Sequence, residues 1–131
     1  MKLIHASALV LAAAGLTACS KTAPSDPLPV APAARVIGEP VSCLQLTQFR
    51  NTKIRDDRTI DFMGSSKKVW RNTLSNSCPG LRAEDAFTYE TSLSQLCNVD
   101  IIYVLRRVGG GLQRGAGCGL GQFVPVELEK K

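Results

Sequence analysis

The chain has 131 residues, a formal net charge of +5 and a single histidine, His5. This length allows one small folded domain, near the lower limit at which a hydrophobic core is self-sufficient. No histidine follows position 5, and Ser-His and Cys-His catalytic systems and most mixed metal sites depend on this residue. The composition therefore argues against an enzyme of these classes.

Residues 1–18 have the pattern of a secretory signal peptide. Lys2 precedes an apolar run over residues 6–14, and small residues follow the run. This run is well short of the ~20 residues that span a bilayer, so we expect cleavage rather than a retained transmembrane helix. His5 would then be absent from the mature chain.

The signal pattern ends in Leu16-Thr17-Ala18-Cys19. An aliphatic residue, two small residues and a cysteine in this order resemble the lipobox of bacterial lipoproteins. The resemblance implies cleavage before Cys19, a diacylglycerol on its thiol and acylation of the new amine, so that membrane lipid holds the protein. Ser20 is not the aspartate that marks inner-membrane retention in this class, which favours the outer membrane, facing the periplasm. The alternative is an ordinary signal cut after residues 12–14, with a free thiol at position 19.

Residues 19–40 are predicted to be a tether between the lipidated cysteine and the folded part. Five of the seven prolines lie in this segment, which holds no aromatic residue. Such a composition buries little apolar surface and favours extended polyproline-II geometry. At ~3.1 Å per residue the tether would reach at most ~60 Å. We therefore expect the folded part to stand off from the membrane.

Residues 41–128 are predicted to form one small all-β domain, followed by a charged tail at residues 129–131. The expected fold is a small antiparallel barrel or sandwich of about five to seven short strands. The candidate strands are residues 59–62, 69–74, 86–89, 100–105 and 123–126, with turns at 55–58, 64–68 and 78–80. Residues 83–97 could instead hold a helical turn. Pro125 predicts that the last strand lies at a sheet edge, because proline has no N–H to donate to a neighbouring strand.

The predicted domain contains four cysteines, Cys43, Cys78, Cys97 and Cys118. An even number in a small domain of an oxidising compartment predicts two disulfides. Their gaps of 35, 19 and 21 residues include no CxxC pair, which argues against zinc. Three pairings are open. We favour the nested one, Cys43–Cys118 with Cys78–Cys97, because it would tie the terminal strands together and close a central loop.

A set of short landmarks runs through the domain. They are Cys43-Leu44, Asp57-Arg58-Thr59-Ile60-Asp61-Phe62, Cys78-Pro79-Gly80-Leu81, Leu96-Cys97 and Cys118-Gly119-Leu120-Gly121. Together they resemble a bacterial family of small envelope proteins known only as a domain of unknown function. The resemblance covers most of residues 43–126. It implies an envelope location, but no activity and no functional residues.

Seven of the eleven glycines lie between residues 109 and 121. Neither GxGxxG nor GxxxxGK occurs there in a strand–helix context, so a nucleotide site is not expected. The segment predicts a flexible hairpin loop whose glycines also allow close packing around a disulfide. The alternative is a mobile binding loop at residues 109–117, with Arg106, Arg107 and Arg114 as anion contacts.

The remaining charged residues give no catalytic pattern. Asp56, Asp57 and Asp61 fit neither an EF-hand nor a glycosidase pair, and are predicted to be turn and surface residues. Residues 65–68 match S-x-x-K formally but lie in a predicted turn. Residues 39–128 hold eleven Lys or Arg and nine Asp or Glu, a net charge of +2, so we expect no nucleic-acid partner. Weak attraction to anionic lipid headgroups or wall polymers is compatible with this charge.

The sequence thus predicts a lipid-anchored cell-envelope protein without cofactor or metal. We expect its domain to be non-enzymatic and to bind or support another envelope component. Two alternatives remain open. One is an inhibitor of an envelope enzyme, with residues 109–117 entering the partner's active site, and the other is a small envelope enzyme.

Overall fold

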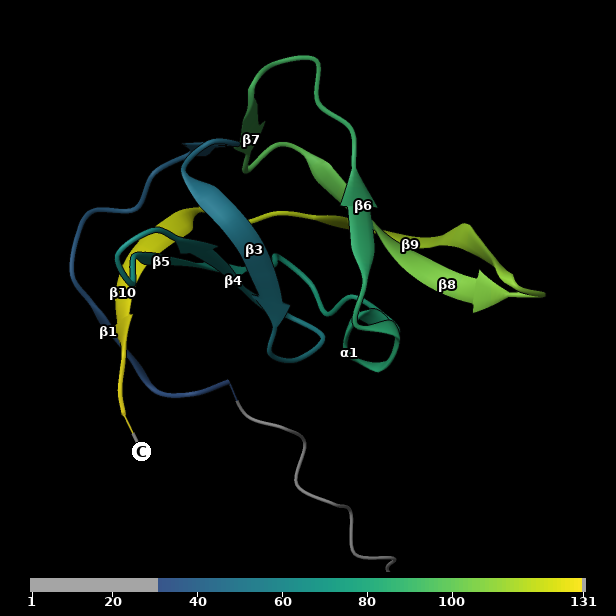
Figure 1. The fold of residues 1–131 in the computed structure, drawn as a ribbon, viewed down its shortest axis with the longest axis horizontal. Coiled ribbons are helices and arrows are strands. Elements are labelled where there is room, and N and C mark those ends of the chain that lie inside the picture. The colour runs from purple at the N-terminus through teal and green to yellow at the C-terminus, as the bar shows by residue number, and fades with distance from the viewer. Residues whose placement is uncertain (1–30, 131) are drawn as a thin grey trace, which may run out of the picture.

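The structure is a computed structural model that describes residues 31–130 (Figure 1). The predicted signal peptide, Cys19 and residues 19–30 of the predicted tether lie outside the described residues. The elements are β1 (Ala34–Val36), β2 (Cys43–Gln45), β3 (Phe49–Ile54), β4 (Thr59–Gly64), β5 (Val69–Thr73), α1 (Leu81–Glu84), β6 (Phe87–Tyr89), β7 (Gln95–Cys97), β8 (Ile101–Val108), β9 (Gly111–Gly119) and β10 (Phe123–Leu128).

The strands between residues 31 and 130 form three antiparallel sheets. A five-stranded sheet has the order β1-β10-β5-β4-β3, a second sheet pairs β2 with β7, and a third has the order β6-β8-β9. The all-β prediction is confirmed. The five-stranded sheet ends at β1 and β3, so it is open rather than closed into a barrel.

One hydrophobic core receives side chains from all three sheets. Phe62 and Phe123 come from the five-stranded sheet, Leu44 and Leu96 from the β2–β7 pair, and Ile102 from β8, and each of them is at most 1% exposed. The Phe62 ring also meets Phe123 edge-on at 5.2 Å between centroids. Such an aromatic pair adds about 0.5–1.5 kcal/mol beyond the area that it buries. The shared core makes the domain a layered, sandwich-like unit.

The five predicted strands are confirmed as parts of β4, β5, β6, β8 and β10, and the predicted turn at residues 55–58 joins β3 to β4. The ten strands of residues 31–130 exceed the predicted five to seven. The candidates did not include β3, β9 and the three-residue strands β1, β2 and β7. The helical alternative for residues 83–97 is not realised there: the one helical turn of residues 31–130, α1, lies at Leu81–Glu84, and Phe87–Tyr89 form strand β6. Helix α1 follows Gly80, whose φ of 82° ends the preceding segment.

Two expectations about the ends of the domain are corrected. β1 lies inside the predicted tether, so the β domain begins before residue 41. β10 is not an edge strand, because it lies between β1 and β5. The Pro125 carbonyl accepts a hydrogen bond from the Ile37 N–H (3.0 Å), so it faces the β1 side. The nitrogen and the carbonyl of one residue face the same side of an antiparallel strand, so the Pro125 ring nitrogen also faces β1. The missing N–H therefore removes no hydrogen bond to β5.

Two disulfides are present, as predicted, but the nested pairing is wrong. The bridges join Cys43 to Cys97 and Cys78 to Cys118. Cys43 and Cys97 lie directly opposite each other in the β2–β7 ladder, with Cα atoms 4.0 Å apart. Antiparallel strands come closest at the pairs that exchange no hydrogen bonds, which places two facing cysteines within bonding reach. With sequence separations of 54 and 40 residues, each bridge stabilises the fold by about 4 kcal/mol on the chain-entropy model.

Asp61 is buried, so the prediction that it lies on the surface is wrong. Its side chain is 0% exposed and accepts from Arg55 Nε (2.7 Å) and Arg71 Nε (2.8 Å). Arg71 also donates to the Pro32 carbonyl at 2.8 Å, which fastens the segment before β1 to the sheet. The turn residue Asp57 accepts from the Cys78 N–H at 2.7 Å through its carbonyl. These aspartates therefore hold chain segments together.

Candidate functional site

The β8–β9 hairpin projects from the body of the domain, on the side away from the five-stranded sheet (Figure 1). Its tip is the pair Gly109-Gly110, with φ values of 56° and 81°. Positive φ at both central residues is the type I′ geometry that matches the twist of paired strands, and it favours glycine. The predicted hairpin is present, but a loop over residues 109–117 is wrong, because residues 111–117 belong to strand β9.

The glycines of β9 make room for side chains of β8. A Cβ atom at Gly115 would lie 2.8 Å from Arg106 Cδ, and one at Gly117 would lie 3.1 Å from the Tyr103 ring. The two β8 side chains thus cover the glycine backbone, an arrangement that supports glycine in strands. At these two positions glycine therefore serves cross-strand packing in a hairpin.

We define the arm as residues 105–114, the outer part of this hairpin. The register pairs Leu105 with Arg114, Arg106 with Gln113 and Arg107 with Leu112. Directly opposed residues share a face, and neighbours along a strand alternate between faces. Arg107, Leu112 and Arg114 therefore lie on one face of the arm, and Arg106 lies on the other. The structure brings the three predicted arginines onto one element but divides them between its two faces.

Arg114 is held in place by two contacts. Its guanidinium pairs with the Glu90 carboxylate and lies 5.1 Å from the centroid of the Tyr103 ring. The hydrogen bond from Arg114, followed by its charge, lowers the pKa of Glu90 below the ordinary value of 4.5. The same pairing raises the pKa of Arg114. These surface contacts join the base of the arm to the segment that follows β6.

The other two arginines are freer. Arg106 Nε is 4.0 Å from Glu84 Oε1, the outer limit of an ion pair. Arg107 forms no ion pair or side-chain hydrogen bond with any residue between 31 and 130. Beside Arg107, Leu112 is 63% exposed. The outer end of the arm therefore presents an unpaired guanidinium next to an exposed aliphatic side chain.

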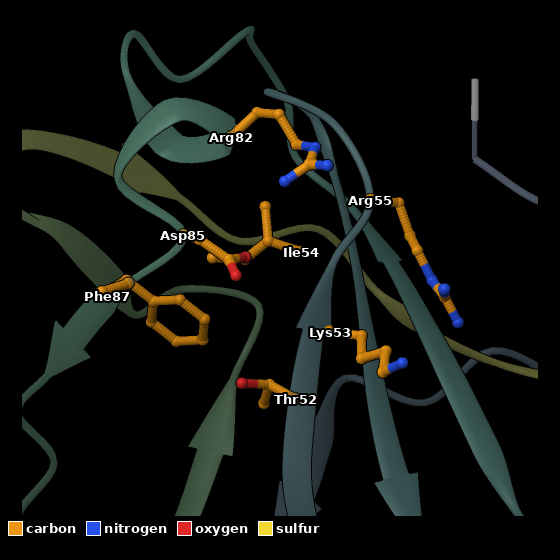
Figure 2. A pocket seen from close by; sticks show the side chains of 8 residues that line it. Thr52, Lys53, Ile54, Arg55, Arg82, Asp85 and Phe87 are labelled. Atoms are coloured by element: carbon orange, nitrogen blue, oxygen red, sulfur yellow. The ribbon is translucent and has the colours of Figure 1, made fainter. Parts of the chain in front are cut away.

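A cleft of about 500 Å³ lies between β3 on one side and α1 with the start of β6 on the other (Figure 2). Its lining residues are Thr52, Lys53, Ile54, Arg55, Arg82, Asp85, Ala86 and Phe87. Figure 2 shows Thr52, Ile54 and Phe87 directed into the cleft, and Lys53 and Arg55 on the opposite side of β3. No sequence pattern indicated this cleft, because its walls are contributed by different sheets.

Other candidate groups add little chemistry. Residues 65–68 form the predicted turn between β4 and β5, where Ser66 and Lys67 adopt positive φ values of 54° and 62°. Between residues 31 and 130 there is no cluster of three or more His, Cys, Asp or Glu side chains suited to a metal ion. The helix of this part of the chain is too short to cross a membrane.

Comparison of the chain with protein-family models, curated proteins and solved structures finds no match. Function is therefore inferred from the residues and their geometry.

Proposed function

We propose that this protein is a lipid-anchored, non-enzymatic component of the bacterial cell envelope whose arm binds an anionic envelope component. One observation carries the proposal. The arm projects from the domain and exposes Arg107 beside Leu112 on a hairpin that is closed by a tight turn and joined at its base by a surface ion pair.

The arm contributes little to the core. Its outer residues, from Arg106 to Arg114, are exposed. Yet the hairpin is constrained by a type I′ turn, by the Arg114–Glu90 pair and by the contact of Arg114 with Tyr103. A preordered element loses less conformational entropy on binding than a flexible loop. This combination of exposure and stiffness suits a recognition element.

The chemistry of the arm favours an anionic partner. No acidic residue occurs between Ile101 and Gly121, whereas three arginines do. A guanidinium presents a planar fork of donors that binds carboxylate or phosphate through two hydrogen bonds. Leu112 adds an apolar contact beside Arg107. Wall polymers and anionic lipid headgroups carry such groups and meet a lipid-anchored protein in the envelope.

The location rests on the lipobox resemblance at Cys19 and on the proline-rich segment after it. Acylation predicts a mature protein that lacks residues 1–18 and carries lipid mass. Replacing Cys19 with serine should abolish that added mass in intact-mass spectrometry. A mature chain that starts near Gly15 without lipid would contradict the anchor.

A sedimentation assay tests the arm. The protein with Cys19→Ser is mixed with isolated wall sacculi, with vesicles containing anionic lipid, or with vesicles of neutral lipid. We expect binding to one of the two anionic materials, and an about tenfold loss of affinity for Arg107→Gln combined with Leu112→Ser. Arg106→Gln is the matched control, because it removes the same charge from the opposite face of the arm. Equal loss from both variants, or none from either, would contradict the proposal.

A further inference from the structure

The cleft of Figure 2 lies between two free strand edges, and we propose that it binds an extended segment of a partner protein whose side chains alternate between acidic and apolar. The segment would pair with β3 as an added strand. This site is separate from the arm and does not depend on the function proposed for it.

The first free edge belongs to β3. The Arg55 N–H donates to the Thr59 carbonyl at 2.8 Å, so the backbone polar groups of Arg55 face β4. Along an antiparallel strand these groups point alternately to the two sides. Those of Ile54 and Thr52 therefore point away from β4, toward the open edge of the sheet. Because β3 ends the five-stranded sheet, no strand of residues 31–130 pairs with them.

The second free edge belongs to β6. The Ala86 carbonyl accepts from the Leu105 N–H at 2.9 Å, so it faces β8. By the same alternation, the backbone polar groups of Phe87 point away from β8. β6 ends its sheet, and residues 31–130 provide no strand beside it. A strand added to β3 would thus meet its unpaired backbone groups, and β6 presents a second free edge near the cleft.

The interior of the cleft sets one half of the ligand's pattern. Ile54 and Phe87 point into it from the two walls (Figure 2), and both are only partly buried. A volume of about 500 Å³ lies within the range of ordinary ligand pockets. A strand added along β3 would direct every second side chain to the cleft side of β3, where Ile54 and Phe87 favour an apolar residue beside the charged side chains of Arg82 and Asp85.

Charge sets the other half of the pattern. β3 and the following residue carry Arg50, Lys53 and Arg55, with no acidic residue among positions 49–55. Arg55 is occupied by Asp61, whereas Lys53 has no ion-pair partner between residues 31 and 130. Opposite charges on facing strand positions attract and like charges repel. A cationic edge therefore disfavours pairing with a second copy of β3 and favours an acidic strand.

The probe is a synthetic hexapeptide of alternating glutamate and valine with blocked ends. Its affinity for the Cys19→Ser protein is measured by fluorescence anisotropy, and NMR follows the amides of Thr52 and Ile54. We expect saturable binding that slows solvent exchange at these two amides. We also expect affinities at least tenfold lower for the same peptide with lysine in place of glutamate. A peptide N-methylated at alternate residues keeps the side chains but loses ladder donors, and it should bind at least tenfold more weakly.

Two protein variants provide a matched comparison. Lys53→Glu should lower the affinity for the acidic peptide about tenfold and raise that for the lysine peptide. Lys67→Glu makes the same charge change in the turn between β4 and β5 and should alter either affinity less than twofold. Retention of affinity by the N-methylated peptide, or equal effects of the two variants, would overturn strand addition at this cleft. Protection of Thr52 and Ile54 that rises with protein concentration alone would show that a second copy is the occupant and would overturn the proposed partner.

Discussion

At Gly121 a single backbone contact restricts the residue to glycine. A Cβ atom there would lie 2.1 Å from the Thr73 carbonyl oxygen. The buried Asn72 side chain holds Gly121 from both sides, accepting from its N–H at 2.8 Å and donating to its carbonyl at 2.7 Å. Asn72 thereby replaces a strand pairing between β5 and the segment before β10. The sequence shows a glycine here, but not this contact.

Gly121→Ala should therefore lower the free energy of unfolding by about 3 kcal/mol, since the backbone must shift and strain two buried hydrogen bonds. Gly119→Ala is the control, because no atom lies within 4 Å of a Cβ at that position. It should change the stability by less than about 0.5 kcal/mol. Urea unfolding of both variants measures the difference. Equal stabilities would show that the Gly121–Thr73 contact is absent.

Single residues also show where sequence reasoning reached its limit. Asp56 and Asp57 were predictable as turn residues, because their neighbours formed a polar run. Asp61 lies in an alternating strand, where its polar character indicated an exposed face. Burial became favourable only because Arg55 and Arg71 reach the same carboxylate, and that pairing depends on the register of three strands.

At the scale of elements, the predictable strands are those with strong local patterns. The continuous apolar run of β8 and the alternation in β4 were visible in the sequence, and both strands are confirmed, although residues 59–62 of β4 are all buried. Within β9, residues 111–117 contain only two aliphatic side chains, Leu112 and Ala116. The sequence therefore showed no alternation of apolar and polar residues there. This segment forms a strand because β8 supplies the partner and the covering side chains. The free edges of β3 and β6, which border the cleft, result from the tertiary arrangement. No local sequence pattern marks them.

The ion pair between Arg114 and Glu90 at the base of the arm can be tested by its dependence on pH. Because Arg114 lowers the pKa of Glu90, the interaction stabilises the fold at pH values above the unfolded pKa and is lost as pH falls through the folded pKa. NMR titration of the Glu90 carboxyl should give a midpoint below 4.5. Arg114→Gln should return it to the ordinary value, whereas Arg107→Gln should leave it low. An unchanged pKa of Glu90 in Arg114→Gln would show that Arg114 does not stabilise the Glu90 carboxylate.

The disulfides join elements that are distant in the chain. Non-reducing peptide mapping should link Cys43 to Cys97 and Cys78 to Cys118. Replacing Cys78 and Cys118 together with serine should lower the free energy of unfolding by up to about 4 kcal/mol, because the 40-residue separation is then unconstrained in the unfolded chain. Recovery of Cys43 linked to Cys118 would contradict the observed register of β2 and β7.

At the scale of the whole molecule, the proposed lipid anchor and the proposed binding arm lie in different parts of the chain. The lipid is predicted at Cys19, whereas the arm is formed by residues 105–114. The structure describes the domain from residue 31 onward. One small core with two disulfides supports both the arm and the cleft. The all-β class was predictable from composition and turn spacing. The direction of the arm was not, because it depends on how β8 continues past the core.

The central claim is that the arm contacts an envelope component, and site-specific photo-crosslinking in intact cells tests it most directly. A photoreactive amino acid replaces Leu112 in one strain and Leu93 in another, two leucines with nearly equal exposure of 63% and 64%. We predict an adduct, identified by mass spectrometry, from position 112 that is lost when Arg107→Gln is added, and none from position 93. Adducts of equal yield from both positions, or from position 93 alone, would contradict the account.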